Sequence, residues 1–186
     1  MLSFIDSFIQ DWGYIALFLG SLIEGESIVL TVSSMCYFGK FSLPKVMMIT
    51  FLGTLLADQI LFYIGRFLGP KIFKTFPYLK EKSKKAFFLL NKYQIPFILS
   101  FRFIYGIRII SPIVVGISNV SSLKYSVLNL IAAFIWTILS CGLGYFIGAF
   151  GNLVGVNNSS IGILFSFIIV ICVIVFFHLF NKSNLK

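Results

Sequence analysis

The sequence predicts an all-α, polytopic helical membrane protein in which two opposed re-entrant helical hairpins form an inverted repeat. Composition is the first observation: 59% of the 186 residues are hydrophobic, 11% are charged, and the mean hydropathy is +1.00. Soluble domains are about 45–50% apolar and about 25% charged, and one of this size could not bury so many large side chains. The second observation is that the apolar segments are long and continuous, which argues against a transmembrane barrel.

The first apolar segment, residues 12–39, is interrupted by Glu24-Gly25-Glu26. A single spanning helix would place two carboxylates near the middle of the bilayer. The halves, 12–23 and 27–39, are each about a dozen residues and reach only ~18–20 Å, which is too short for a hydrocarbon core of ~30 Å. We therefore expect a re-entrant hairpin whose tip lies at residues 24–26.

Residues 44–69 are long enough to span the membrane, with Pro44 suited to the first helical position. Asp58 interrupts this apolar run and Arg66 lies near its end. Gly69-Pro70 is expected to end the helix. Residues 71–95 then form a basic loop in which residues 79–92 make an amphipathic surface helix.

Residues 96–119 repeat the problem of the first segment, because they are apolar except for Arg102 and Arg108. Six residues of continuous helix correspond to a rotation of ~240°, so the two arginines would not share a face. A break between them would let both side chains point to one place. A second re-entrant hairpin is the expected structure.

Two further spans are expected at 124–150 and 160–180. Gly144 and Gly148, four residues apart in the first of them, permit close helix packing. Hairpin and span therefore occur twice, and Tyr63-Ile64-Gly65 is echoed by Tyr145-Phe146-Ile147-Gly148 at an offset of about 83. The first hairpin enters from outside and the second from the cytoplasm, an inverted repeat that is common in transporters.

The net charge of +9 is distributed as a topology signal. Seven lysines and one acid, Glu81, fall within the basic loop: Lys71, Lys74, Lys80, Lys82, Lys84, Lys85 and Lys92. By the positive-inside rule, this loop and the C-terminus with Lys182 and Lys186 are cytoplasmic. The pattern indicates attraction to anionic lipid headgroups and no nucleic-acid partner.

Six charges lie in segments expected to be embedded, and they sum to zero: Glu24, Glu26, Asp58, Arg66, Arg102 and Arg108. Each costs ~2.5–3.5 kcal/mol on insertion scales unless it pairs, reaches the interface or lines a wet cavity. One interpretation is structural: salt bridges between the hairpins, Asp58 as a packing residue, and Arg66 reaching the headgroups. The other interpretation is functional.

In the functional interpretation, Arg102 and Arg108 bind a phosphate headgroup, because a guanidinium is always charged and its planar fork fits phosphate. Glu24, Glu26 or Asp58 would take up and release the coupling proton, because an apolar site raises the pKa of a carboxyl group. No Ser-His-Asp, Walker A, Rossmann or metal-ligand pattern is present. We therefore expect no enzymatic activity, no metal and no cofactor.

The sequence motifs around these charged residues resemble those of the DedA proteins, also called the SNARE-associated or VTT domain family. The run Arg102-Phe103-Ile104-Tyr105-Gly106-Ile107-Arg108, followed by Pro112 and Gly116, looks like the family's R-F-x-P-G-x-R…G motif, with Tyr105 at the usual Pro. Glu24-Gly25-Glu26 is similar to its acidic motif, although no Pro precedes Gly25. The remaining matches are Gly53 to Gly69 with Asp58 and Arg66, where Ala57 stands at a frequent Gly, and Trp136 followed by Gly144-Tyr145 and Gly148.

The resemblance covers about residues 12–151 and implies a multi-pass protein of the bacterial inner membrane. It implies movement of undecaprenyl phosphate or phospholipid across the bilayer, a flippase activity that depends on the proton motive force. The family's essential acids match Glu24 or Glu26 and Asp58, its essential arginines match Arg102 and Arg108, and Arg66, Tyr105 and Gly106 would support them.

The leading hypothesis is a translocator whose partners are membrane lipids, an anionic lipid or polyprenyl phosphate substrate, and protons. A homo-oligomer is also compatible with the sequence. One alternative is a proton-coupled exporter of a small ion or solute, with the arginines as counter-ions. The other is a membrane scaffold that transports nothing, for which exchanging the charges of a pair should restore function.

Overall fold

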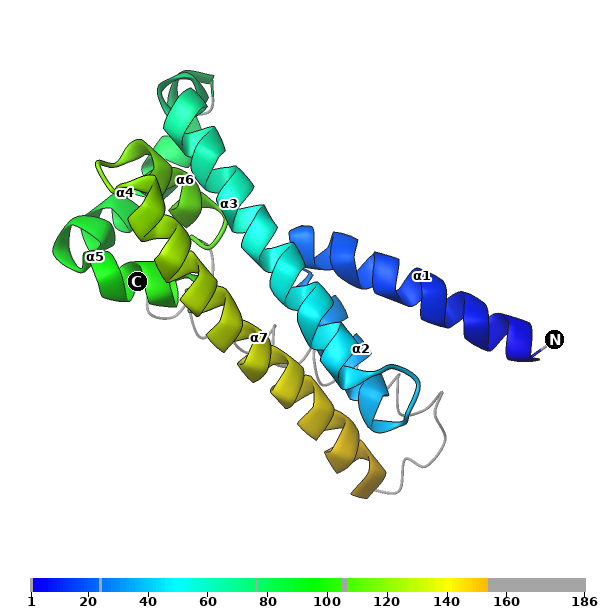
Figure 1. Cartoon of the computed structure of the whole chain (residues 1–186). Helices are drawn as coiled ribbons and strands as arrows, with labels where there is room; N and C mark the ends of the chain where they lie inside the picture. The colour runs from blue at the N-terminus through cyan, green and yellow to red at the C-terminus, as the bar shows by residue number, and fades with distance from the viewer. Residues whose placement is uncertain (1, 24, 76, 105–106, 154–186) are drawn as a thin grey trace. The chain divides into compact units, whose positions relative to one another are not determined.

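The computed structural model describes residues 2–23, 25–75, 77–104 and 107–153, which are helical and contain no strand (Figure 1). The elements follow in the order α1 (Leu2–Leu22), α2 (Glu26–Tyr37), α3 (Leu43–Thr75), α4 (Pro77–Lys92), α5 (Gln94–Ser100), the 3₁₀ helix η1 (Phe101–Phe103), α6 (Ile110–Ile117) and α7 (Ser122–Leu153). The all-α prediction is confirmed for these residues. The expected third span at 160–180 lies outside them.

The chain divides into two compact units, which we describe separately. Unit 1 consists of Met1–Thr54 and Thr137–Lys186, and unit 2 of Leu55–Trp136.

Within the described residues, two helices are long and apolar enough to cross a membrane: Leu43–Gly69 and Ser122–Asn152. Along α3, exposed apolar side chains recur every four residues, at Met48, Leu52, Leu56 and Ile60. The buried face of the same helix carries the polar residues Thr50, Thr54 and Asp58. An apolar exterior and a polar interior are the reverse of a soluble helix and suit a lipid environment.

Two helices are longer than the sequence predicted. The first half of the first hairpin, expected at residues 12–23, is continuous with residues 2–11 in α1. The span expected to end at Gly69-Pro70 continues through both residues to Thr75. A proline removes one backbone hydrogen bond and bends a helix, but the neighbouring turns can carry the helix past it.

In unit 1, α1 and α2 follow one another and are in contact, and the Gly25 N–H donates to the Gly20 carbonyl at 2.5 Å where the chain turns. α2 also packs closely on α7. A Cβ atom on Gly144 would lie 2.6 Å from the Leu30 carbonyl oxygen, and one on Gly148 would lie 2.5 Å from the Ser34 carbonyl oxygen. The close packing predicted for this glycine pair is confirmed, because no larger residue fits at either position.

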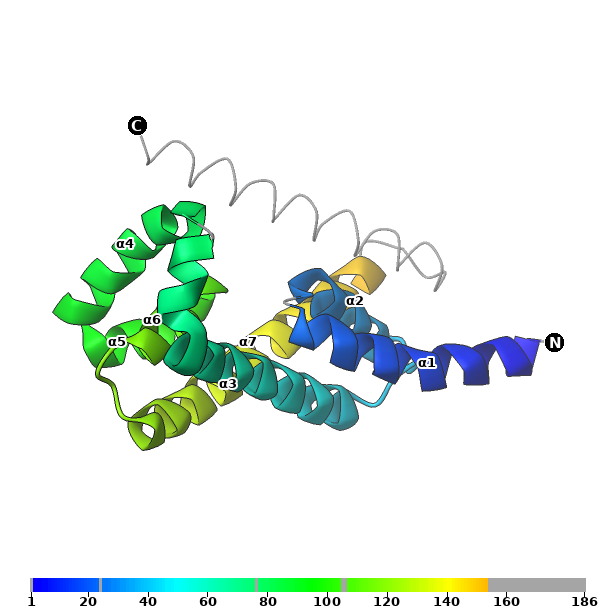
Figure 2. The same cartoon turned by 90° about the horizontal axis from the view of Figure 1, so that it is seen from above.

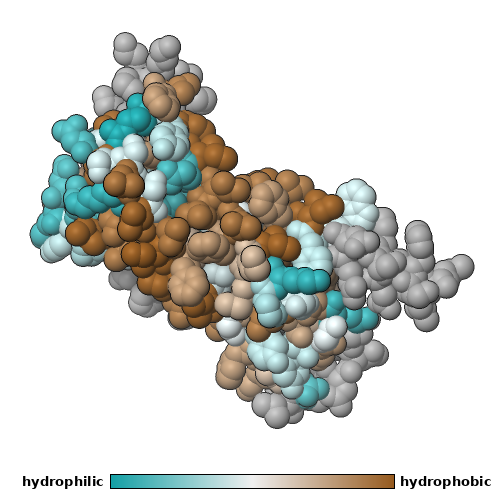
Figure 3. Space-filling view, viewed as in Figure 1, coloured by the Kyte–Doolittle hydropathy of each residue, from teal (hydrophilic) through white to brown (hydrophobic). Residues whose placement is uncertain are grey.

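In unit 2, α4, α5 and α6 lie together (Figures 1 and 2), around a core in which Phe62, Phe97, Phe101 and Val114 are almost fully buried. α4 turns a buried face toward this core and exposes Lys84, Lys85 and Lys92. Hydrophilic residues accordingly gather over α4 in Figure 3, while the surface of α3 is largely hydrophobic. α4 is therefore amphipathic.

The backbones of α3 and α6 touch in unit 2 at two glycines. A Cβ atom on Gly65 would overlap the Ile113 carbonyl oxygen. One on Gly116 would overlap the Phe62 carbonyl oxygen and lie 2.9 Å from the Arg66 backbone nitrogen. This contact sets the position of α6 on α3, and with it the position of the chain that leads into α6.

Candidate functional site

The candidate site is built around a helix break in unit 2. α5 ends at Ser100, η1 ends at Phe103, and Ile104 is extended with φ −98° and ψ 101°. α6 begins at Ile110. Arg102 lies in η1, before the break, and Arg108 lies within the break, two residues before α6; their exposed fractions are only 3% and 9%.

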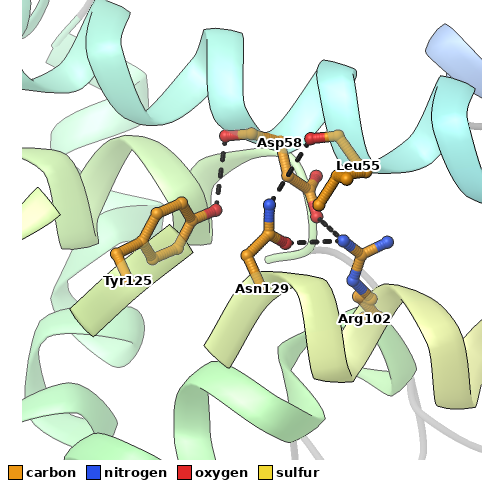
Figure 4. Close-up of polar contacts among 5 residues, drawn as sticks. All are labelled: Leu55, Asp58, Arg102, Tyr125 and Asn129. Carbon is orange, nitrogen blue, oxygen red and sulfur yellow. Dashed lines mark hydrogen bonds and ion pairs between the residues drawn. The ribbon is translucent and has the colours of Figure 1, made fainter. Parts of the chain in front are cut away.

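Arg102 forms a buried ion pair with Asp58 of α3. Its Nη2 atom lies 2.5 Å from Asp58 Oδ2, and the exposed fractions of the two side chains are 0% and 7% (Figure 4). The same Nη2 atom donates a hydrogen bond of 2.6 Å to Asn129 Oδ1 on α7. A pair this deeply buried is tolerated only where the charges compensate one another and are hydrogen-bonded.

Two residues of α7 complete this cluster, and sequence reasoning missed both. Asn129 Nδ2 donates to the Leu55 carbonyl oxygen at 3.4 Å, and the Tyr125 hydroxyl donates to the backbone carbonyl of Asp58 at 3.3 Å (Figure 4). Both side chains are fully buried. The available signal was their spacing: they are four residues apart and therefore on one face of an otherwise apolar span.

Arg108 lies against an aromatic ring. Its guanidinium carbon is 4.6 Å from the centroid of Trp136, and Trp136 has an exposed fraction of 2%. Arginine over the face of Trp is a favourable cation–π arrangement. The sequence singled out Trp136 only as part of a motif, and this contact gives it a role: it positions Arg108 beside the helix break.

Arg66 donates hydrogen bonds to backbone carbonyl oxygens and not to the cluster around Asp58 and Arg102. Nη1 donates to the Ser118 carbonyl at 3.0 Å and Nη2 donates to the Val120 carbonyl, just after the end of α6. The guanidinium also lies 5.1 Å from the centroid of Phe62. Arg66 thus fastens the C-terminal end of α6 to α3, which is a supporting role.

The other predicted site residues are placed as follows. Glu26 is the first residue of α2 and is partly exposed. It belongs to unit 1, whereas the cluster belongs to unit 2. Glu24, Tyr105 and Gly106 lie outside the described residues. Of the six embedded charges, the structure therefore brings together Asp58 and Arg102 in an ion pair, with Arg108 near enough to interact electrostatically with Asp58.

The Asn129 contact can be tested by its effect on stability. We expect Asn129→Leu to lower the free energy of unfolding by about 1.5–3 kcal/mol, because a hydrogen bond to a charged group is lost. Chemical unfolding in detergent micelles measures this change. Ser126→Ala is the matched control: it removes a neutral hydrogen bond that α7 accepts from α3, from Gln59 Nε2 at 2.9 Å, and should cost only about 0.5–1.5 kcal/mol. Equal losses would contradict a special role for Asn129.

Comparison with known proteins agrees with this structure. Residues 23–146 match the VTT domain. The chain is 32% identical over 141 residues to inner membrane protein YohD of Escherichia coli strain K12, which is 76% of this chain and 73% of YohD. It is 22% identical over 131 residues to inner membrane protein YqjA of the same strain, which is 69% of this chain and 60% of YqjA. No solved structure matches the chain.

The apolar exterior, the two long apolar helices and these relatives define a helical protein of the inner membrane. Its interior contains a buried ion pair beside a broken helix. The chain belongs to the VTT domain (DedA) family, because the match covers well over half of its length. The resemblance seen in its motifs is thereby confirmed.

Proposed function

We propose that this protein moves an anionic lipid, undecaprenyl phosphate or a phospholipid, across the inner membrane and that the proton motive force drives the movement. The observation that carries the proposal is the buried Asp58–Arg102 pair, with Arg108 across the helix break, beneath an exterior suited to lipid. Charged groups and irregular backbone at such depth are expensive, and in membrane proteins they mark substrate and proton pathways.

The contacts favour different roles for the two arginines. Arg102 is held by the Asp58 carboxylate and the Asn129 carboxamide, so its charge already compensates Asp58. Arg108 lies within the break, in contact with the Trp136 ring and near enough to Asp58 to interact with it electrostatically. We assign the lipid phosphate to Arg108, since the arginine fork fits phosphate. We assign the proton to Asp58, because protonation would weaken its pairing with Arg102.

The proposal includes two opposed re-entrant hairpins, α1–α2 and α5–α6, in an inverted repeat. Support comes from one contact that occurs in each unit: the Leu30 carbonyl of α2 meets Gly144, and the Ile113 carbonyl of α6 meets Gly65. Leu30 and Ile113 are 83 positions apart, which is the offset of the sequence echo, and the glycines that they meet are 79 positions apart. Repeats of this kind are a common plan of secondary transporters.

We place the exposed lysines of α4, and the C-terminus, on the cytoplasmic side by the positive-inside rule. We expect a cysteine introduced by Lys84→Cys to react with a membrane-impermeant thiol reagent in inverted vesicles and not in intact cells. The opposite result would reverse the orientation.

The test is transbilayer movement of labelled undecaprenyl phosphate and of a labelled phospholipid in proteoliposomes, with and without an imposed pH gradient. We expect Arg108→Ala to lose at least tenfold in rate, Asp58→Asn to lose the response to the gradient, and Lys84→Ala, an exposed control, to behave as wild type. Movement of neither lipid by the wild type would overturn the proposal and favour a proton-coupled exporter of a small solute. Recovery of function in an Asp58→Arg and Arg102→Asp double variant would favour a scaffold.

A further inference from the structure

Unit 1 contains three buried hydroxyl groups that have no hydrogen-bond partner among the residues that the structure describes: Ser33 of α2, Thr50 of α3 and Thr137 of α7. Their exposed fractions are 0%, 0% and 3%. A hydroxyl group can donate one hydrogen bond and accept others. Buried polar groups nearly always have a partner, so three such groups in one unit require an explanation.

The three hydroxyls belong to one cluster around a thiol. The Cys141 thiol lies within reach of the hydroxyls of both Ser33 and Thr50, although neither contact has the geometry of a full hydrogen bond, and Cys141 is fully buried. Thr137 lies one turn before Cys141 on the same face of α7. The cluster thus joins three helices, and the thiol at its centre is only a weak hydrogen-bonding partner.

Two other buried hydroxyls in unit 1 are satisfied within their own helices. Ser34, next to Ser33, donates to the Thr31 carbonyl at 2.8 Å, and Ser21 donates to the Phe18 carbonyl at 2.8 Å. This is the usual solution for a serine inside a membrane helix. No such hydrogen bond is formed by Ser33, Thr50 or Thr137, so their O–H groups need another acceptor.

We propose that the cluster is an internal hydration site that binds water through the hydroxyls of Ser33, Thr50 and Thr137. Water both accepts and donates, so it satisfies several hydroxyls that cannot satisfy one another, and buried waters typically make about three such bonds. A neutral ring of hydroxyls and one thiol suits water better than an ion, because it offers no charge to balance one.

The position of the site suggests what the water does. Ser33 lies seven residues after Glu26, on the same face of α2. The titratable groups on this face of α2 and on the face of α7 around the cluster are Glu26, Cys36, Tyr37, Cys141 and Tyr145. Resting on the proposed proton-driven function, we assign to the site the passage of a coupling proton through its water to and from Glu26, a second carboxylate in addition to Asp58.

Hydration can be measured without any transport. X-ray radiolysis of the intact protein in micelles produces hydroxyl radicals from bound water, which oxidise adjacent side chains, and mass spectrometry reads the product at Cys141. We expect rapid oxidation of Cys141 and at least a fivefold slower rate in a Ser33→Ala and Thr50→Val double variant. Ser34→Ala is the matched control and should leave the rate unchanged. Thermal unfolding of each variant verifies that it is folded.

Slow oxidation of Cys141 in the wild type, or equal rates in the double variant and in Ser34→Ala, would overturn the hydration site. In proteoliposomes, we expect the double variant to lose at least tenfold in gradient-dependent lipid movement, whereas Ser34→Ala should lose none. An unchanged response would overturn the proton role. Rapid Cys141 oxidation in a wild type that moves no lipid would sink the proposed function and leave the hydration site standing.

Discussion

Replacing Arg102 by leucine is expected to lower the free energy of unfolding by about 3–5 kcal/mol. The substitution removes the guanidinium that compensates the Asp58 carboxylate at 2.5 Å, and it leaves that carboxylate buried. Breaking a buried ion pair from one side is costly because the remaining charge stays buried without the partner that hydrogen-bonded to it. Asn129 would lose its hydrogen bond at the same time. Chemical unfolding in detergent micelles gives the change in free energy directly.

The control is Lys84→Leu, which removes an exposed positive charge from the same unit and should change stability by no more than about 0.5 kcal/mol. A double variant, Asp58→Asn with Arg102→Leu, should lose less than the sum of the single losses, because neither charge is then left alone. Additive losses would show that the pair contributes nothing as a pair.

Gly116→Ala is expected to cost about 1–3 kcal/mol or more, the range for overpacking a well-packed contact. The new Cβ atom would overlap the Phe62 carbonyl oxygen and approach the Arg66 backbone nitrogen. Both are backbone atoms of α3, so relief requires the two helices to separate. The same unfolding measurement applies, and we expect weaker gradient-driven lipid movement, because α6 carries the chain that holds Arg108.

Gly142→Ala is the matched control for this substitution. Gly142 is also helical, and a Cβ atom added there would meet no atom within 4 Å. Alanine is favoured over glycine in a helix interior by about 0.5–1 kcal/mol, so this variant should be slightly stabilised. A loss of stability equal to that of Gly116→Ala would mean that helix contact is not the reason for glycine at position 116.

Sequence alone predicted the helical class and the close packing at Gly144 and Gly148, because long apolar runs and small-residue spacing are local patterns. It placed Arg102 and Arg108 on either side of a break, since six residues cannot bring two side chains to one face of a helix. It did not predict that α3 passes Pro70, because the cost of a proline depends on what surrounds it.

The partners within the site could not be predicted from the sequence. Asp58 and Arg102 are 44 positions apart, and their pairing follows from how α3 and η1 pack. Asn129 and Trp136 were visible only as one amide and one ring in an apolar span. Long-range contacts of this kind depend on tertiary packing, which the hydrophobic periodicity of the sequence does not reveal.

The contact of Gly65 and Gly116 with backbone atoms has a mechanical consequence. Helices that touch backbone to backbone cannot slide past one another without a clash, and Arg66 fastens their far end through the carbonyls of Ser118 and Val120. We therefore expect α6 and the part of α3 from Asp58 to Gly69 to move as one body. Asp58 belongs to that body, and Arg108 lies directly before it. A rearrangement of unit 2 that separated Arg102 from Asp58 would therefore have to move η1 against this body.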